Sequence, residues 1–225
     1  MKSWCIGTPS ARFVAKMEDV LEVYHRPYDP NHPVICLDER SKALRSTPRG
    51  GLPARPGAYQ REDYEYERTG VCNLFLWVEP LAGHREVRVT KRRTAVDFAE
   101  QLRELVEAAY PHAEKIVLVT DNLNIHSPSA LYERYPPAQA RRIAQRLEWH
   151  YTPEHGSWLN MAEIELSALS RQCLSRRLDN QATVAREAAM WAHQRNQAQT
   201  KVDWQFTTAD ARIKLKRLYP IVCHE

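Results

Sequence analysis

The sequence predicts an α/β fold, a mixed β-sheet flanked by helices with a helical extension at the C-terminal end. The run at 116–119 is too apolar to alternate and short enough to be a strand covered on both faces. The segments at 71–80 and 84–92 flank Leu81–Gly83 in the pattern of a hairpin. With 225 residues, 43% of them hydrophobic, the chain can bury one sizeable core.

The first half of the chain begins with a predicted helix. Apolar residues recur at helical spacing from Phe13 to Tyr24, and prolines then end the helix. A buried strand follows from Pro33 and ends in acid, at Asp38 and Glu39. The segment 41–63 holds three glycines and three prolines, so we expect a long basic loop there.

The second half alternates helices and strands. An amphipathic helix is expected over 94–110 with Thr94 as its N-cap, and it precedes the strand at 116. Another strand, 146–152, is ended by Pro153. Helices are expected at 158–174, 181–195 and 208–218.

This order of elements is that of ribonuclease-H-like folds. In such an arrangement the strands at Val34 and Ile116 can lie side by side and parallel, so Asp38 and Asp121 would emerge together at the edge where open α/β sheets place their sites. A third acid could come from the helix that follows the strand at 146–152. The candidates are Glu154, Glu163 and Glu165.

Three carboxylates at one sheet edge point to metal chemistry. Two divalent cations about 4 Å apart can activate a water or a 3′ hydroxyl and stabilise the leaving oxygen of a phosphodiester, and Mg²⁺ prefers oxygen ligands. Without a cation, crowded carboxylates repel one another and take up protons. Taken alone, each acid could be a turn residue or an N-cap. His126 alone would more often be a structural histidine than a ligand, although near phosphates it could donate a hydrogen bond or relay a proton.

Charge and cysteine content narrow the class of protein further. The net charge is +4, and residues 141–225 hold all the excess, with 13 basic against 9 acidic residues. This is either a solvated helical face or a surface for phosphate backbones. Five scattered cysteines without paired spacing indicate neither a disulfide framework nor a structural zinc site. No apolar run suits a membrane span or a signal peptide, so we expect a soluble, cytoplasmic protein, associated with the nucleoid when bound to DNA.

Five segments in order resemble DDE transposases of the Tc/mariner superfamily, in the bacterial insertion-sequence branch. LDE at 37–39, TDNLNIH at 120–126 and YTPEHGSWLNMAEIE at 151–165 are similar to the three acidic motifs of that family. DYEYERTGVCNLF at 63–75 and WQFTTADARIKLKRLYP at 204–220 are similar to its second-strand and C-terminal segments. The resemblance covers nearly the whole chain.

The resemblance implies a catalytic domain that binds two Mg²⁺ or Mn²⁺ ions, cuts the ends of its element and joins them to target DNA, acting as a homodimer when active. Its acids map onto Asp38, Asp121 and Glu163, with Glu39, Asn122, His126 and Glu165 in supporting roles. Phosphate contacts would come from basic side chains of the loop and the C-terminal helices. These are Arg45, Arg49, Arg55, Arg61, Arg176, Arg177, Lys214 and Arg217.

The expected organisation is an N-terminal helix and connection over 1–32, a catalytic domain over 33–178 and a basic helical extension over 179–225. Family members usually carry helix-turn-helix domains upstream, so a chain that starts near the first helix is expected to lack recognition of specific element ends. Two alternatives stay open: another ribonuclease-H-like nuclease, or an inactive transposase remnant.

The choice between Glu163 and Glu165 rests on position along the helix. Residues two apart differ by about 200° around a helix axis, so both cannot face the same metals. The apolar stripe does not decide between them. Glu163 is nearer the start of the helix, where the strand ends should lie, and it falls four residues after Leu159, as the family's final acid does. We therefore expect Glu163 to be the ligand.

Overall fold

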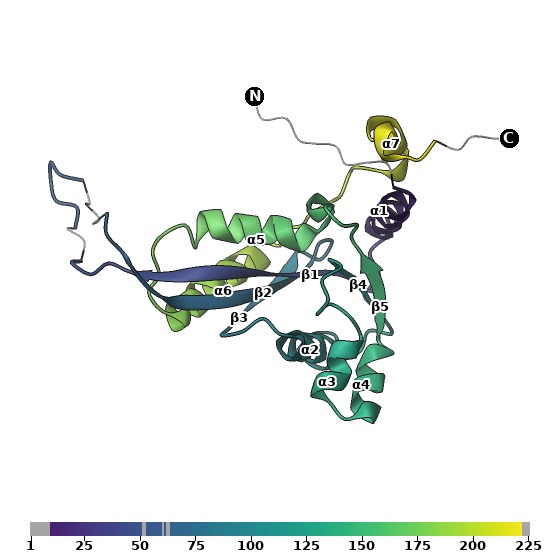
Figure 1. Cartoon of the computed structure of the whole chain (residues 1–225), viewed down its shortest axis with the longest axis horizontal. Helices are drawn as coiled ribbons and strands as arrows, with labels where there is room; N and C mark the ends of the chain where they lie inside the picture. Colours follow the sequence, from purple (N-terminus) through teal and green to yellow (C-terminus); the bar gives the residue numbers. More distant parts are fainter. Residues whose placement is uncertain (1–9, 51–52, 60, 62–63, 222–225) are drawn as a thin grey trace.

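The fold is a five-stranded mixed sheet with helices on both faces (Figure 1). The computed structural model describes residues 10–50, 53–59, 61 and 64–221. The strands are β1 (Val34–Ser46), β2 (Glu67–Glu79), β3 (His84–Thr90), β4 (Ile116–Thr120) and β5 (Leu147–Tyr151). The α-helices are α1 (Ala11–Tyr24), α2 (Ala95–Glu104), α3 (Ser129–Arg134), α4 (Pro137–Ala144), α5 (Met161–Gln172), α6 (Gln181–Gln197) and α7 (Thr208–Lys214).

The strand order is β3-β2-β1-β4-β5. The first three strands form an antiparallel meander, whereas β4 pairs parallel with β1 and β5 pairs parallel with β4. The predicted mixed sheet, its hairpin and the parallel pairing of the strands at Val34 and Ile116 are therefore confirmed. The hairpin comes first in the chain and the helix-linked parallel strands come last, which is the order that the sequence predicts.

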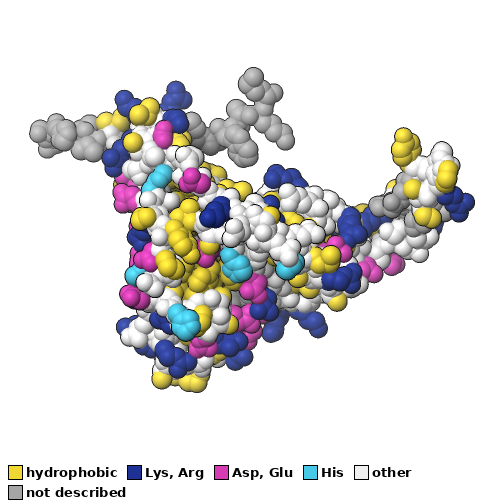
Figure 2. All heavy atoms as spheres, turned by 180° about the vertical axis from the view of Figure 1, so that it is seen from behind, with side chains coloured by type: hydrophobic (Ala, Val, Ile, Leu, Met, Phe, Trp, Pro, Cys, Tyr) yellow, Lys and Arg dark blue, Asp and Glu magenta, His cyan; other side chains and the backbone are white. Residues whose placement is uncertain are grey.

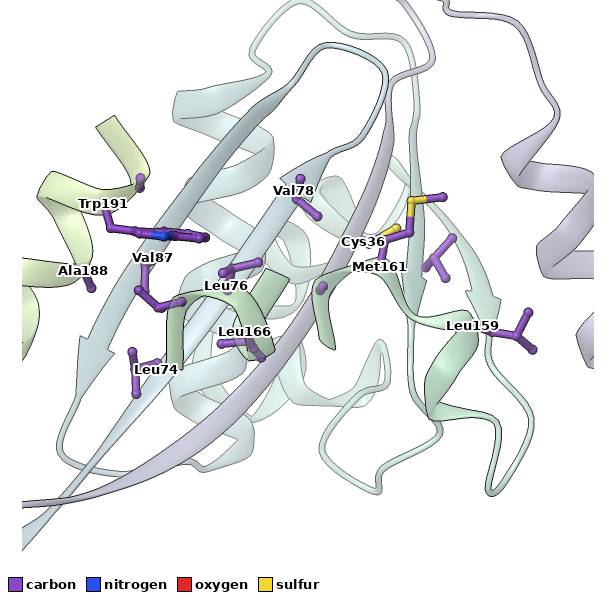
Figure 3. Packing of buried hydrophobic residues seen from close by; sticks show 14 of the residues in the cluster. Cys36, Leu74, Leu76, Val78, Val87, Leu159, Met161, Leu166, Ala188 and Trp191 are labelled. Carbon is purple, nitrogen blue, oxygen red and sulfur yellow. The ribbon is translucent and has the colours of Figure 1, made fainter. Parts of the chain in front are cut away.

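Each face of the sheet carries its own hydrophobic core. On one face α5 and α6 cover the sheet, and Figure 3 shows Leu166 of α5 and Trp191 of α6 against Leu74, Leu76 and Val87. On the other face α2, α3 and α4 pack against the alternate side chains, such as Ile35 and Leu37. Strands buried on both sides need apolar residues at every position. This explains the uninterrupted apolar run of β4.

The sequence predicts that the first strand ends at Asp38 and Glu39, and this prediction is wrong. β1 continues to Ser46, and its second half pairs with the start of β2 from Ser41↔Asn73 to Ser46↔Glu67. This pairing satisfies backbone groups that a loop would leave to water. The predicted loop 41–63 is thus in part a two-stranded arm that projects from the sheet (Figure 1). Asp38 consequently lies in the middle of a strand.

Three predicted helices differ from the expectation at their ends. The helix after Thr94 has the predicted cap, because the Thr94 and Asp97 side chains each bind the other's backbone N–H, but it continues as a π-helical turn over Leu105–Ala109. The segment expected as one helix over 158–174 is a 3₁₀ turn, Ser157–Leu159, followed by α5. Asn160 separates them as the N-cap of α5. The helix predicted over 208–218 is likewise divided into two parts, α7 and a 3₁₀ turn, Lys216–Leu218.

The remaining structural expectations concern cysteines and membranes. Cys36, Cys72 and Cys173 are free thiols, while Cys5 and Cys223 lie outside the described residues. Within the described part of the chain, none of the helices has the length and apolar character that crossing a membrane requires.

The turn between β2 and β3 depends on Gly83. Its φ is +70°, and an added Cβ would lie 2.8 Å from the backbone carbon of Gln199. We therefore expect Gly83→Ala to destabilise the fold. Gly57→Ala is the matched control, because its φ is +82° and no atom lies within 4 Å of an added Cβ. Both substitutions carry a left-handed backbone cost of about 1–2 kcal/mol, and urea unfolding should show a clearly larger loss for Gly83→Ala. Equal losses would contradict the contact with Gln199.

Candidate functional site

The parallel pairing of β1 and β4 brings Asp38 and Asp121 to the same part of the sheet. Their strands pair in the register Cys36↔Val119, and two further residues along each strand lead to Asp38 and Asp121. Asp38 is buried at 9% exposure, whereas the side chain of Asp121, just beyond β4, is 41% exposed. The site is therefore open to solvent on the Asp121 side.

The Asp38 carboxylate is held at both oxygens. Oδ1 accepts a hydrogen bond of 2.7 Å from the Glu39 backbone N–H, and Oδ2 accepts one of 3.3 Å from the Asn160 amide. Burial and the charge of neighbouring Glu39 raise the pKa of Asp38 to about 7, and Asp121 contributes in the same direction. Burial is the largest of these effects, and the neighbouring carboxylates act in the same direction.

His126 connects Asp121, which directly follows β4, to Glu39 of β1. Its Nδ1 lies 2.5 Å from Asp121 Oδ1, and its Nε2 lies 2.7 Å from Glu39 Oε2. The Thr120 hydroxyl is 3.1 Å from Nδ1. At the far end, Arg93 lies 3.4 Å from Glu39 Oε1. Arg93, Glu39, His126 and Asp121 thus form one continuous chain of alternating charge.

The middle of this chain, His126 with Glu39, is buried, and His126 is protonated there. The His126 side chain is fully buried, Glu39 is 2% exposed, and Phe98 covers the imidazole at 4.5 Å between ring centres. Burial alone lowers the pKa of His126, but hydrogen bonds and charges from Asp121 and Glu39 outweigh it and raise the pKa to about 9. With both ring nitrogens protonated, His126 donates a hydrogen bond to Asp121 through Nδ1 and forms an ion pair with Glu39 through Nε2, and these contacts fix the orientation of Asp121. The predicted supporting residue Asn122 is exposed beside it.

Glu163 and Glu165 face different surroundings on α5. Glu163 is half-buried in the first turn of the helix, one turn after Asn160, which contacts Asp38. Residues three apart share a helix face. Glu165 is 2% exposed and lies between Arg85 of β3, at 3.0 Å, and Arg195 of α6, at 2.8 Å. Its carboxylate is committed to an ion cluster that fastens α5 to its neighbours.

The acids fit a divalent cation by their chemistry. Asp38 and Asp121 supply hard oxygen ligands, and a cation would compensate the charges of these two carboxylates. Among the described residues, no three Asp, Glu, His or Cys side chains come close enough together to form a metal cluster. The third acid candidate Glu154 is at the surface, 3.9 Å from Arg12. The assignment of Glu163 as a ligand therefore stays a prediction.

The residues predicted to contact phosphates lie in two separate places. Lys214 and Arg217 are exposed at the C-terminal helices, while the others lie on or beside the arm. Figure 2 shows Lys and Arg side chains along the arm, and Tyr59 and Tyr64 of the arm are 95% and 83% exposed.

Several of these arginines also make contacts within the protein. Arg177 donates to the backbone oxygens of Glu65 and Tyr64, and the Arg45 guanidinium lies 4.5 Å from the centre of the Tyr66 ring. Arg49 forms an ion pair with Glu65, and Arg176 forms one with Glu187. Arg55 and Arg61 are exposed.

Sequence reasoning missed a basic segment beside the acids. Lys91, Arg92 and Arg93 follow β3, and Arg93 contacts Glu39 directly. Lys91 and Arg92 are exposed and form no ion pair within the described residues. The run of three basic residues was visible in the sequence, but only the sheet order places it next to the acids. Asn160, Arg85 and Arg195 carried no sequence signal that separates them from surface residues.

Comparisons with known proteins find a matching family and solved structures with a similar fold. The model of a family described as DDE superfamily endonuclease matches residues 33–185. The crystal structure of the mariner Mos1 paired end complex with Mg superposes with a TM-score of 0.57 at 15% identity, covering 98% of this chain and 67% of that one. The Mos1 strand transfer complex gives a TM-score of 0.54 at 14% identity, covering 88% and 64%. No curated protein matches the sequence.

The predicted fold, a ribonuclease-H-like mixed sheet with helices on both faces, is confirmed by these neighbours. The family match covers more than half of the chain, which therefore belongs to the DDE superfamily of endonucleases. The chain spans about two thirds of the length of the Mos1 chains that it matches.

The buried chain of charges predicts a cost for removing His126. His126→Ala leaves Glu39 buried with Arg93 as its remaining ionic partner, and breaking a buried ion pair costs about 3–5 kcal/mol. We expect a loss near 3 kcal/mol in urea unfolding. The double variant Glu39→Gln/His126→Ala should lose less than the sum of the two single variants, because the buried charge is gone. Strict additivity would show that the two side chains do not interact.

Proposed function

We propose that the chain is the catalytic part of a DNA transposase that cuts DNA at the ends of its element and joins the 3′ hydroxyl to target DNA. The observation that carries the proposal is the juxtaposition of Asp38 and Asp121 at paired parallel strands in a chain of the DDE superfamily. The structural neighbours are complexes of Mos1 described as paired end and strand transfer complexes, one with Mg. The bacterial insertion-sequence branch is the assignment that the sequence motifs favour.

In this proposal Asp38, Asp121 and Glu163 hold two Mg²⁺ or Mn²⁺ ions. Bound cations would activate a water molecule or the 3′ hydroxyl of the DNA and would stabilise the leaving oxygen. His126 keeps the Asp121 carboxylate in one orientation through its hydrogen bond to Oδ1, and Glu39 holds the other end of the imidazole. Arg93 closes this chain at the surface and presents a positive charge beside the acids.

DNA would contact the protein through its exposed cations. We propose that Lys91 and Arg92 bind phosphates of the strand at the active site, because they are exposed and directly precede Arg93, which contacts Glu39. The arginines of the arm and the C-terminal Lys214 and Arg217 would extend this contact along the duplex. Such contacts are independent of sequence and sensitive to salt. We further propose that two copies of the chain act together at a pair of element ends.

Cleavage and joining assays test the catalytic assignment. Asp38→Asn, Asp121→Asn and Glu163→Gln should each abolish metal-dependent cleavage of a duplex carrying the element's ends, with the fold intact by circular dichroism. Glu165→Gln is the matched control two residues away and should retain much of the activity, at lower stability, because it weakens the ion pairs with Arg85 and Arg195. Full activity of Glu163→Gln alongside an inactive Glu165→Gln would reverse the assignment.

Product analysis separates the proposal from other activities on this fold. Joining of a labelled 3′ end to new DNA is expected of a transposase. Cleavage of hybrids or branched DNA without joining would instead identify another nuclease, and absence of any cleavage would identify an inactive remnant.

Salt dependence tests the basic segment. Each phosphate contact contributes about 0.9 to the slope of log affinity against log salt on duplex DNA. Lys91→Ala/Arg92→Ala should therefore reduce that slope by nearly two units in fluorescence anisotropy with a duplex oligonucleotide. The control Arg141→Ala/Arg142→Ala removes two exposed charges from α4 and should leave the slope unchanged. An equal effect of the two double variants would exclude a localised contact at 91–92.

A further inference from the structure

Asn160 connects the strand that carries the first acid to the helix that carries the third. Its side chain is 1% exposed, although asparagine is a strongly polar residue. As the N-cap of α5, its Oδ1 accepts a hydrogen bond of 3.0 Å from the Ala162 backbone N–H. This bond fixes which end of the amide points into the helix.

The other end of the same amide faces β1. Because Oδ1 is used by the helix, Nδ2 is the group that reaches Asp38 Oδ2 at 3.3 Å and the Leu37 backbone oxygen at 3.4 Å. The Asn160 backbone oxygen in turn accepts from the N–H of Glu163 at 3.1 Å. One residue therefore links the Asp38 carboxylate to the first turn of α5, where Glu163 lies.

The amide is suited to this position because it is neutral. A lysine or arginine would also hold Asp38, but its charge would compensate the carboxylate that a cation needs. Another carboxylic acid would cap α5 equally well but would repel Asp38. Asparagine orients the carboxylate with a single hydrogen bond and leaves its negative charge in place.

We propose that Asn160 is a positioning residue that sets the Asp38 carboxylate relative to Glu163 for divalent cation binding. The inference rests on the proposed function, since it assumes that the two acids hold a metal. Helix capping alone does not require asparagine at this position, because serine and aspartate are N-caps of similar quality. The donor from Nδ2 to Asp38 is the property that these residues lack.

Calorimetric titration with Mn²⁺ tests the proposal on the DNA-free chain. Asn160→Ser keeps the cap and removes the amide donor, and we expect it to bind Mn²⁺ at least about tenfold more weakly than the wild type, as is typical when a residue that orients a metal ligand is replaced. Asn180→Ser is the matched control. Asn180 is the N-cap of α6, accepts a hydrogen bond from the Thr183 backbone N–H and donates to a surface carboxylate, Asp179. This variant should bind Mn²⁺ like the wild type.

Melting temperatures supply a second measurement that does not depend on activity. Asn160→Asp preserves the shape and the cap but places a fourth carboxylate against Asp38. In chelator we expect its melting temperature to fall below that of Asn160→Ser, because repulsion between the two carboxylates is added to the loss of the Nδ2 donor. A role in capping alone predicts that Asn160→Asp and Asn160→Ser melt at the same temperature.

The outcomes separate the two levels of inference. Mn²⁺ binding by Asn160→Ser with wild-type affinity overturns the positioning role while the proposed function stands. A wild-type chain that takes up no Mn²⁺, or takes it up equally after Asp38→Asn, overturns the proposed metal chemistry and the role of Asn160 with it. Weaker binding by Asn160→Ser but not by Asn180→Ser supports the proposal.

Discussion

The parallel pairing of β1 with β4 is the constraint on which the candidate site depends. It places Asp38, Glu39 and Asp121 within reach of one another, although more than 80 positions separate the first acid from the last. The pairing is stable because both strands are buried on two faces, so their apolar residues contribute to two cores at once. Folding energy from these cores holds together carboxylates that would otherwise repel one another.

The site divides its acids between the two faces of the sheet. Asp38 points toward α5, where Asn160 holds it, and Glu39 points toward α2, where His126 lies under Phe98. Successive side chains of a strand alternate between faces, so adjacent acids in the sequence acquire different partners. One remains a candidate ligand with a raised pKa, and the other is paired with a protonated histidine.

Helix α5 is fixed at two points with distinct consequences. At its first turn Asn160 joins it to Asp38, and near its middle Glu165 is clamped between Arg85 and Arg195. Together these contacts set both the position of α5 along its own axis and its rotation about that axis. Glu163 lies between these two contacts along the helix, and its role as a metal ligand stays a prediction.

The sequence by itself predicted the hairpin, the two strands that lead to Asp38 and Asp121, and most of the helices, because apolar residues recur with the period of a helix or a strand where one face is buried. It also indicated Glu163 over Glu165 from position along a helix. The tertiary structure alone decided that β1 continues past Asp38 into an arm, since the polar residues 41–46 become a strand only by pairing with 67–73. It alone decided that Glu39 contacts both His126 and Arg93, that Asn160 contacts Asp38 and that Glu165 contacts Arg195. The two residues of each contact are at least 30 positions apart, and no local pattern encodes such a contact.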